Sequence, residues 1–397
     1  MIASVLPSYA RAPLTFERGE GPYLFAADGR KYLDFTSGVA VVSLGHANPR
    51  LVKALTDQAQ KLWHCSNLFE VEGQKRVAAK LIDNSFADTV FFCNSGAEAV
   101  EAAIKIARKY QAATGHPEKF RIIACTGSFH GRTLATLAAA GNEKYLAGFG
   151  PPLEGFDHVA FGNLNEMRAA VTAETAAVLV EPVQGEGGLA TPPAGYLKGL
   201  RQLCDEYGLM LVYDEVQSGM GRAGKLFAHQ WDPEGAPDIL ATAKGLGGGF
   251  PVGACLVTEN AAIGMVPGTH GSTFGGNPLA MAVAEEVLAI MLEPGFFEHV
   301  NAMGKALRTR LDRLVAAYPK LFEETRGAGL LIGLKCVVPN MEVVARLRDA
   351  GLLAAAAGEN VVRLMPPLNV AEAQLDEAAR IIDGVGRNWE RAGADAS

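Results

Sequence analysis

The chain has 397 residues, which is long enough for more than one hydrophobic core, because single cores stop growing near about 250–300 residues. Hydrophobic residues make up 49% of the sequence and charged residues 20%, as in an ordinary globular enzyme. The net charge is −7 and no block of Lys and Arg occurs, so we expect no nucleic-acid partner.

The six cysteines are scattered without a CxxC pair, and the eight histidines form no HExxH motif. We therefore expect reduced core thiols, a cytoplasmic location and no metal site. No stretch approaches the roughly 18 uninterrupted apolar residues of a membrane span, and the N-terminal segment lacks the basic and apolar parts of a signal peptide. The sequence thus predicts neither a membrane anchor nor a secretory signal.

In chain order, residues 15–45 contain short alternating segments around an Ala-Ala-Asp-Gly-Arg turn, which predict a β-hairpin. From about 50 to 290, short apolar runs alternate with amphipathic segments. Buried strands are expected at 89–93, 121–125, 176–182, 209–215 and 239–244, and helices at 97–110, 196–207 and 277–292. This alternation predicts an α/β fold with a mostly parallel sheet covered by helices on both faces.

Beyond residue 292 the pattern changes to long charged helices, at 301–318 and 371–392, with short apolar strands at 329–338 and 359–365 between them. This pattern indicates a second, smaller α+β domain. We expect three parts, which are an N-terminal segment 1–48 that joins the small domain, a large α/β domain 49–291 and the small domain 292–397.

Ligands of open α/β sheets bind beyond the carboxyl ends of the strands, so the residues after each strand are the candidates. Ser95, Gly96 and Ala97 begin a helix after the first strand, where free N–H groups favour a phosphate, although many such turns are only caps. After the second strand, Phe129 could stack on a flat ring or simply pack in the core. Arg132 in the same loop is either a surface residue or a carboxylate clamp.

Two further strands end in charged residues. Asp214 could cap a helix, or it could keep a pyridine nitrogen protonated. Lys244 lies in a long apolar segment, so burial favours its neutral amine, which is a nucleophile toward aldehydes, unless the side chain reaches the surface. A later loop of hydroxyls and glycines, with Ser272 and Thr273, is a second candidate phosphate contact.

Residues 219–226 match two nucleotide-binding patterns, GxGxxG and GxxxxGK. The first pattern requires a strand directly before it and a helix directly after it, but the expected strand ends earlier and no helix follows. The second requires a Ser or Thr where Leu226 stands. We therefore expect no nucleotide site here.

Six motifs occur in order along nearly the whole chain, namely SGAE, SFHGRT, EPVQGEGG, DEVQSGMGRAG, AKGLGGGFPVGA and GSTFGGNP. Together they resemble the class III pyridoxal-phosphate aminotransferases of fold type I, and within that family the acetylornithine/succinyldiaminopimelate branch, with ornithine aminotransferase as a near relative. The resemblance implies a mostly parallel central sheet covered by helices, a smaller α+β domain built from both chain ends, and a homodimer with shared active sites.

The resemblance also implies a role for each candidate residue. Lys244 matches the Schiff-base lysine, and Asp214 matches the partner of the pyridine nitrogen. The other implied contacts to pyridoxal 5'-phosphate are Ser95, Gly96, Ala97, Phe129, Val216, Gln217 and, across the dimer interface, Thr273. The implied substrate contacts are Arg132, Ser272, Glu186 and Arg363.

The implied reaction moves the terminal amine of N2-acetyl-L-ornithine to 2-oxoglutarate, as in arginine biosynthesis. Arg132 would bind the carboxylate remote from the reacting amine, while Glu186 masks Arg363 until 2-oxoglutarate enters. N-succinyl-diaminopimelate, succinylornithine, ornithine and 4-aminobutyrate are alternative amine donors. An aminomutase, a decarboxylase and a racemase on the same fold are more remote alternatives, and none of these would need 2-oxoglutarate.

Overall fold

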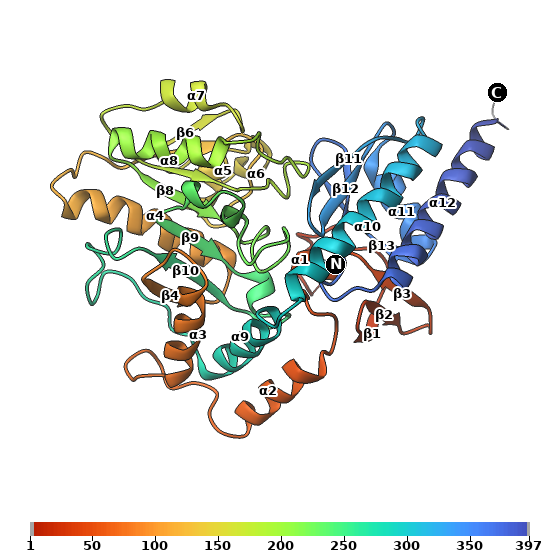
Figure 1. Ribbon diagram of the computed structural model, residues 1–397, viewed down its shortest axis with the longest axis horizontal. Helices are drawn as coiled ribbons and strands as arrows, with labels where there is room; N and C mark the ends of the chain where they lie inside the picture. Colours follow the sequence, from red (N-terminus) through yellow and green to blue (C-terminus); the bar gives the residue numbers. More distant parts are fainter. Residues whose placement is uncertain (1–3, 395–397) are drawn as a thin grey trace.

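The computed structural model describes residues 4–394, which build three β-sheets (Figure 1). The middle of the chain forms a seven-stranded sheet with surrounding helices. The two chain ends, red and blue in Figure 1, lie side by side and contain the two smaller sheets. Segments that are distant in the sequence therefore build one region of the fold.

The central sheet has the strand order β4-β10-β9-β8-β7-β5-β6. Every neighbouring pair is parallel except those of β10, which runs antiparallel to both β4 and β9. The expected mostly parallel sheet is confirmed, although β6 and β10 were not predicted as strands. The strands are β4 (Thr89–Cys93), β5 (Arg121–Cys125), β6 (Phe156–Val159), β7 (Thr175–Val180), β8 (Met210–Asp214), β9 (Ile239–Thr242) and β10 (Gly253–Val257).

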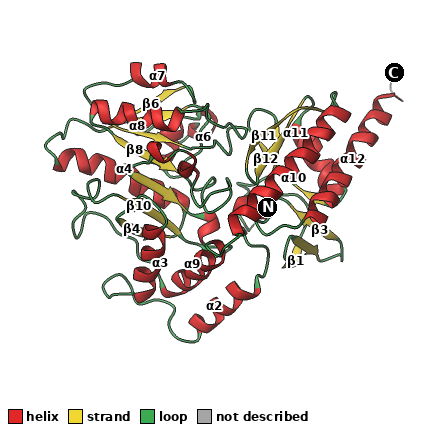
Figure 2. Cartoon of the chain, viewed as in Figure 1, coloured by secondary structure: helices red, strands yellow, loops and turns green. Residues whose placement is uncertain are grey.

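Helices cover both faces of this sheet (Figure 2). Leu179 of β7 packs in the same cluster as the inner face of α4, whereas its neighbours Val178 and Val180 pack with α8. Because successive strand residues point to opposite faces, burial on both sides requires a continuous apolar run. The helices of this region are α2 (Pro49–Ala59), α3 (Glu72–Asp83), α4 (Gly96–Ala113), α5 (Leu134–Ala140), α6 (Glu143–Leu146), α7 (Leu164–Ala169), α8 (Tyr196–Tyr207) and α9 (Pro278–Met291).

Both chain ends contribute to one of the smaller sheets. Its order is β1-β2-β3-β13, where β1 (Phe16–Glu20), β2 (Tyr23–Ala26) and β3 (Lys31–Asp34) form antiparallel pairs. The expected hairpin is thus present. The partner of β3 is β13 (Leu352–Leu353), which pairs in parallel from the other end of the chain.

The second small sheet has the order β11-β12-β15-β14 and follows α9. The expected strands at 329–338 and 359–365 correspond to β12 and β15, whereas the polar strand β11 was not predicted. The remaining elements are α1 (Ser37–Ala40), α10 (Phe296–Ala317), β11 (Phe322–Ala328), β12 (Leu331–Cys336), α11 (Asn340–Asp349), β14 (Ala355–Ala357), β15 (Val361–Leu364) and α12 (Glu372–Ala394).

Two further properties concern membranes and metals. No helix among residues 4–394 is both long and apolar enough to cross a membrane. The same described residues contain no group of three or more His, Cys, Asp or Glu side chains placed to hold a metal ion.

Candidate active site

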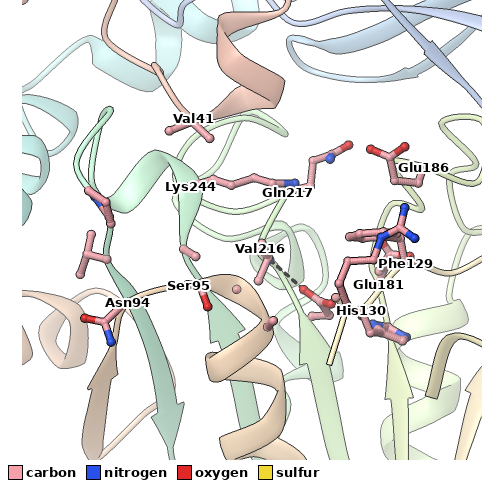
Figure 3. Close-up of a pocket in the computed structure, with 18 of the residues that line it drawn as sticks. Val41, Asn94, Ser95, Phe129, His130, Glu181, Glu186, Val216, Gln217 and Lys244 are labelled. Carbon is pink, nitrogen blue, oxygen red and sulfur yellow. Dashed lines mark hydrogen bonds and ion pairs between the residues drawn. The ribbon is translucent and has the colours of Figure 1, made fainter. Parts of the chain in front are cut away.

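A cavity of about 410 Å³ opens at the carboxyl ends of β4, β5, β7, β8 and β9 (Figure 3). Figure 3 shows Ser95 on one side and Phe129 with Glu186 on the other, with Lys244 and Gln217 between them. All candidate residues from the sequence line this cavity except Ser272, Thr273 and Arg363. Those that line it are Ser95, Gly96, Ala97, Phe129, Arg132, Glu186, Asp214, Val216, Gln217 and Lys244.

The turn after β4 places the N-terminus of α4 at the cavity wall. The Ser95 hydroxyl accepts a hydrogen bond from the Glu98 amide at 3.2 Å, which caps α4 as the sequence indicated. A Cβ atom on Gly96 would lie only 2.6 Å from Cγ1 of Val216, so glycine is required for this close approach. The first N–H groups of a helix lack intrahelical partners, and the amides of residues 96 and 97 are therefore suited to donate hydrogen bonds to a phosphate.

Lys244 follows β9 and begins a short 3-10 turn, Lys244–Leu246. Its backbone is left-handed, with a φ of 43°, a conformation that a residue with a side chain rarely adopts. Burial, assisted by the positive charge of Arg363, lowers the pKa of the Lys244 amine to about 8. The neutral, nucleophilic form of the amine is therefore accessible near neutral pH.

Asp214 ends β8, and both oxygens of its carboxylate have partners. Oδ2 lies 2.8 Å from Nδ1 of His130, and Oδ1 accepts a hydrogen bond from the Val216 amide at 3.0 Å. Asp214 and His130 are both buried, which fixes the orientation of the carboxylate. His130 was not among the predicted site residues, although it belongs to the SFHGRT loop after β5.

Glu181 is a second carboxyl group on the wall of the cavity, and sequence reasoning gave it no role. Its Oε2 accepts a hydrogen bond from the Phe129 amide at 3.0 Å. Burial, with the nearby negative charge of Asp214, raises the pKa of Glu181 well above its ordinary value. Glu181 and Asp214, two of the three carboxyl groups that line the cavity, thus have different hydrogen-bond partners.

Arg363 lies in β15 and does not line the cavity, but it contacts two residues that do. Its guanidinium lies 2.7 Å from Glu186 Oε1 and donates to Gln217 Oε1 at 2.8 Å. Arg363 is only 2% exposed, and the half-buried Glu186 supplies its counter-charge. The structure therefore brings together the arginine and the glutamate that the sequence placed about 180 residues apart.

Ser272 and Thr273 lie on the loop before α9, and neither lines the cavity. The Ser272 hydroxyl accepts a hydrogen bond from the side chain of Asn94, a cavity residue, at 3.0 Å. Thr273 instead lies beside a small crevice formed with His64 and Asn67. Within one chain, Thr273 therefore does not line the cavity that contains the proposed phosphate turn.

These residues fit pyridoxal phosphate. The cavity combines a lysine with a lowered pKa, a carboxylate held by two partners, an aromatic side chain and an unobstructed helix N-terminus. Such groups match the aldehyde, the ring nitrogen, the flat ring and the phosphate of that cofactor.

The sequence matches the family Aminotransferase class-III over residues 5–385. It is similar to the acetylornithine aminotransferase of Mesorhizobium japonicum, with 57% identity over 95% of this chain and 94% of that protein. It is also similar to the succinylornithine transaminase/acetylornithine aminotransferase of Pseudomonas aeruginosa, with 47% identity over 94% of this chain and 92% of that protein.

Comparison with solved structures also finds aminotransferases. The chain is similar to the ornithine aminotransferase of Toxoplasma gondii, with a TM-score of 0.93, 32% identity and coverage of 98% of this chain and 94% of that one. It is also similar to the N-acetylornithine aminotransferase of Stenotrophomonas maltophilia, with a TM-score of 0.85, 37% identity and coverage of 97% and 98%. The expected fold type I architecture is confirmed, and the chain belongs to the class III aminotransferases.

Proposed function

We propose that the protein transfers the terminal amine of N2-acetyl-L-ornithine to 2-oxoglutarate, giving N-acetylglutamate 5-semialdehyde and L-glutamate in arginine biosynthesis. The observation that carries the reaction type is the lowered pKa of Lys244 in one cavity with Asp214 and the phosphate-binding turn. Five relatives at 52–57% identity share the name acetylornithine aminotransferase, which supports this substrate.

Class III aminotransferases use pyridoxal phosphate, and a structure of Toxoplasma gondii ornithine aminotransferase has it at the active site. In this chain, Ser95, Gly96 and Ala97 would hold the phosphate. Phe129 and Val216 would contact the ring, while Gln217 would bind the phenolic oxygen and Lys244 the aldehyde carbon. When bound, the cofactor supplies an electron sink for the carbon that carries the amine.

The protein residues orient the reactants and move a proton. Asp214, fixed by His130 and the Val216 amide, keeps the ring nitrogen protonated. The Lys244 amine, neutral in part near pH 7, takes the proton from the substrate carbon that carries the amine. Together these two residues provide the charge stabilisation and the general base that transamination requires.

One site must accept two different substrates in turn. Arg132 makes no ion pair with any residue between 4 and 394, so it is free for the remote carboxylate of either substrate. Arg363 is paired with Glu186 and becomes available for the α-carboxylate of 2-oxoglutarate only when Glu186 moves away. If Glu186→Ala left the preference for terminal over α-amines unchanged, this gating role would be wrong.

We also infer a homodimer that completes each active site, with Thr273 reaching the phosphate of the partner subunit. Exposed apolar side chains lie in the two segments that include the Thr273 crevice, and such patches mark interfaces. They are Leu62, Trp63, Leu68, Phe69 and Phe274. Nothing in this inference requires assembly beyond two chains.

We also infer a division into two domains. The pairing of β3 with β13 supports a small domain made of residues 1–48 and 292–397, beside a large domain 49–291.

We infer a cytoplasmic location from the cysteines. All six cysteines are free thiols, and five of them are buried, which supports a reducing, cytoplasmic location.

The proposed function is tested by the visible absorbance spectrum of the purified protein, before and after N-acetylornithine is added without keto acid. Loss of the yellow band of the bound cofactor, and its return with 2-oxoglutarate, would support both half-reactions. An unchanged yellow band would reject this donor in favour of the other terminal amines. Turnover without 2-oxoglutarate would favour an aminomutase, and a protein that cannot bind pyridoxal phosphate would overturn the role of Lys244.

A further inference from the structure

Tyr145, on the short helix α6 (Glu143–Leu146), contacts two residues that line the cavity. Its ring centre lies 3.8 Å from the guanidinium carbon of Arg132. Its ring also meets that of Phe129 edge to face, with the ring centres 6.3 Å apart at an angle of 87°. Tyr145 therefore joins the residue expected to stack on the cofactor to the residue expected to bind the substrate carboxylate.

The position of Tyr145 is fixed by the turn between α5 and α6. Gly141 has a left-handed φ of 63°, and a Cβ atom there would clash with the His158 ring. Glycine is thus needed for the chain to turn tightly at this point. Asn142 then caps α6 by accepting a hydrogen bond from the Lys144 amide.

Besides Tyr145, the Arg132 guanidinium meets the ring of Phe129, whose centre is more distant at 5.4 Å, and no polar partner among residues 4–394 holds it. The side chain is exposed, and within the described part of the chain it forms neither an ion pair nor a side-chain hydrogen bond. A long, free arginine loses rotamer freedom when it binds a carboxylate, and this loss weakens binding. A guanidinium that already lies over an aromatic face is held by its attraction to the π electrons and loses less freedom.

We propose that Tyr145 is a positioning residue for substrate selection, whose ring face holds Arg132 at the cavity so that Arg132 receives the carboxylate remote from the reacting amine. This role rests on the proposed function. The ring, and not the hydroxyl, performs it, because the Tyr145 hydroxyl makes no hydrogen bond to any residue that the structure describes. Phenylalanine at this position should therefore support Arg132, whereas an aliphatic side chain should not.

The test compares Tyr145→Leu with Tyr145→Phe in the holoenzyme. We expect Tyr145→Leu to raise the KM for N-acetylornithine about 2- to 5-fold, with kcat changed less than about twofold, because a cation–π contact at an exposed site has that strength. Tyr145→Phe should keep both constants within about twofold of the wild type. Tyr145→Met, which keeps the length of the side chain without the ring, repeats the test if the leucine variant does not fold.

A second measurement does not depend on turnover. Glutarate is an unreactive dicarboxylate, and calorimetry should show that Tyr145→Leu weakens its binding by a similar factor. In an Arg132→Ala background, the same substitution should have no further effect. The proposal is overturned if glutarate binding is unchanged in Tyr145→Leu, or if Tyr145→Phe is impaired as much as Tyr145→Leu.

These arms separate the two proposals. If the wild type does not react with N-acetylornithine, but Tyr145→Leu binds glutarate more weakly than the wild type does, the proposed amine donor is wrong and the proposed role of Tyr145 stands. If the wild type uses N-acetylornithine and Tyr145→Leu binds and reacts equally well, only the positioning role of Tyr145 is wrong.

Discussion

Lys244 combines two unfavourable features in one residue, a left-handed backbone and an amine removed from water. Each has a cost, since such strain persists only where the surrounding structure imposes it. The nearby carboxylates of Glu186, Asp214 and Glu181 oppose the effect of burial on the lysine, but burial prevails and leaves its pKa at about 8. The benefit is chemical, because a lysine of ordinary pKa is almost entirely protonated at pH 7.

The lowered pKa predicts how the cofactor-free protein takes up pyridoxal phosphate. Only the neutral amine reacts, so the rate constant should rise about tenfold per pH unit below pH 8 and level off above it. Stopped-flow absorbance between pH 6 and pH 10 measures this rate. The amine of free N-acetyl-lysine methyl amide is the control, and its rate should keep rising to about pH 10.

Two results would contradict this prediction, one concerning the pKa of Lys244 and the other the identity of the reacting amine. A rate that rises in parallel with the control up to pH 10 would show that burial does not lower the pKa of Lys244. Uptake that persists with the same spectrum in Lys244→Ala would show that another amine reacts. A plateau near pH 8 that disappears in this variant is the expected outcome.

At the scale of helices and strands, much of the site could be predicted because its residues follow apolar strands. Ser95, Phe129, Asp214 and Lys244 each come within a few residues of a strand end, and parallel strands bring their carboxyl ends to one edge. The direction of β10 could not be predicted in this way. A fully buried strand has the same apolar pattern in either direction, so the pattern shows neither its partners nor its orientation.

His130, which sequence reasoning missed, and Glu181, to which it gave no role, act through contacts between distant segments. His130 matters through Asp214, which lies 84 positions later, and Glu181 through the amide of Phe129. Neither contact leaves a trace in local spacing or periodicity. Strand β11 was missed for a different reason, since its sequence FEETRGA is mostly polar and only its first residue is fully buried.

Arg222 belongs to the segment that matched the nucleotide-binding patterns, and the structure gives it another function. Its guanidinium donates to the carbonyl oxygens of Leu330 and Pro366, at 3.1 and 2.5 Å, and the Leu330 amide donates back to the Arg222 carbonyl. Burial lowers the pKa of Arg222 to about 9. The loop after β8 is thereby hydrogen-bonded to the turn before β12 and to the turn after β15, the strand that contains Arg363.

We therefore predict that Arg222→Met weakens both the fold and the binding of 2-oxoglutarate. Two buried carbonyl groups would lose their partners, which costs about 1–3 kcal/mol each. The thermal midpoint should fall by several degrees, and the KM for 2-oxoglutarate should rise several-fold more than the KM for the amine donor. Calorimetry and steady-state kinetics measure the two effects.

Lys225, three positions after Arg222 in the same loop, provides a matched control because its side chain is exposed. Lys225→Met removes a positive charge from the same loop and should leave both quantities nearly unchanged. If Arg222→Met were as stable as the control and bound 2-oxoglutarate equally well, Arg222 would not position the strand of Arg363.

At the scale of the whole molecule, the placement of Thr273 determines what one chain can do alone. Thr273 lies in a crevice with His64 and Asn67, outside the cavity that contains Lys244. Because Thr273 does not line the cavity of its own chain, we infer that it contributes to a phosphate site through a second chain. The dimer inferred above would thus be part of the active site, beyond any contribution to stability.

Mixed dimers test this arrangement directly. One subunit carries Lys244→Ala and the other carries Thr273→Asp, whose negative charge repels the cofactor phosphate. If Thr273 acts on the partner's site, one of the two sites combines both substitutions and the other combines neither, so the mixed dimer should keep about half of the wild-type activity and cofactor. If Thr273 acts on its own chain's site, each site carries one substitution and the mixed dimer should be as inactive as the two parent homodimers. The measurement is activity and bound pyridoxal phosphate in dimers purified with two different affinity tags, so a mixed dimer without a fully active site would overturn the shared site.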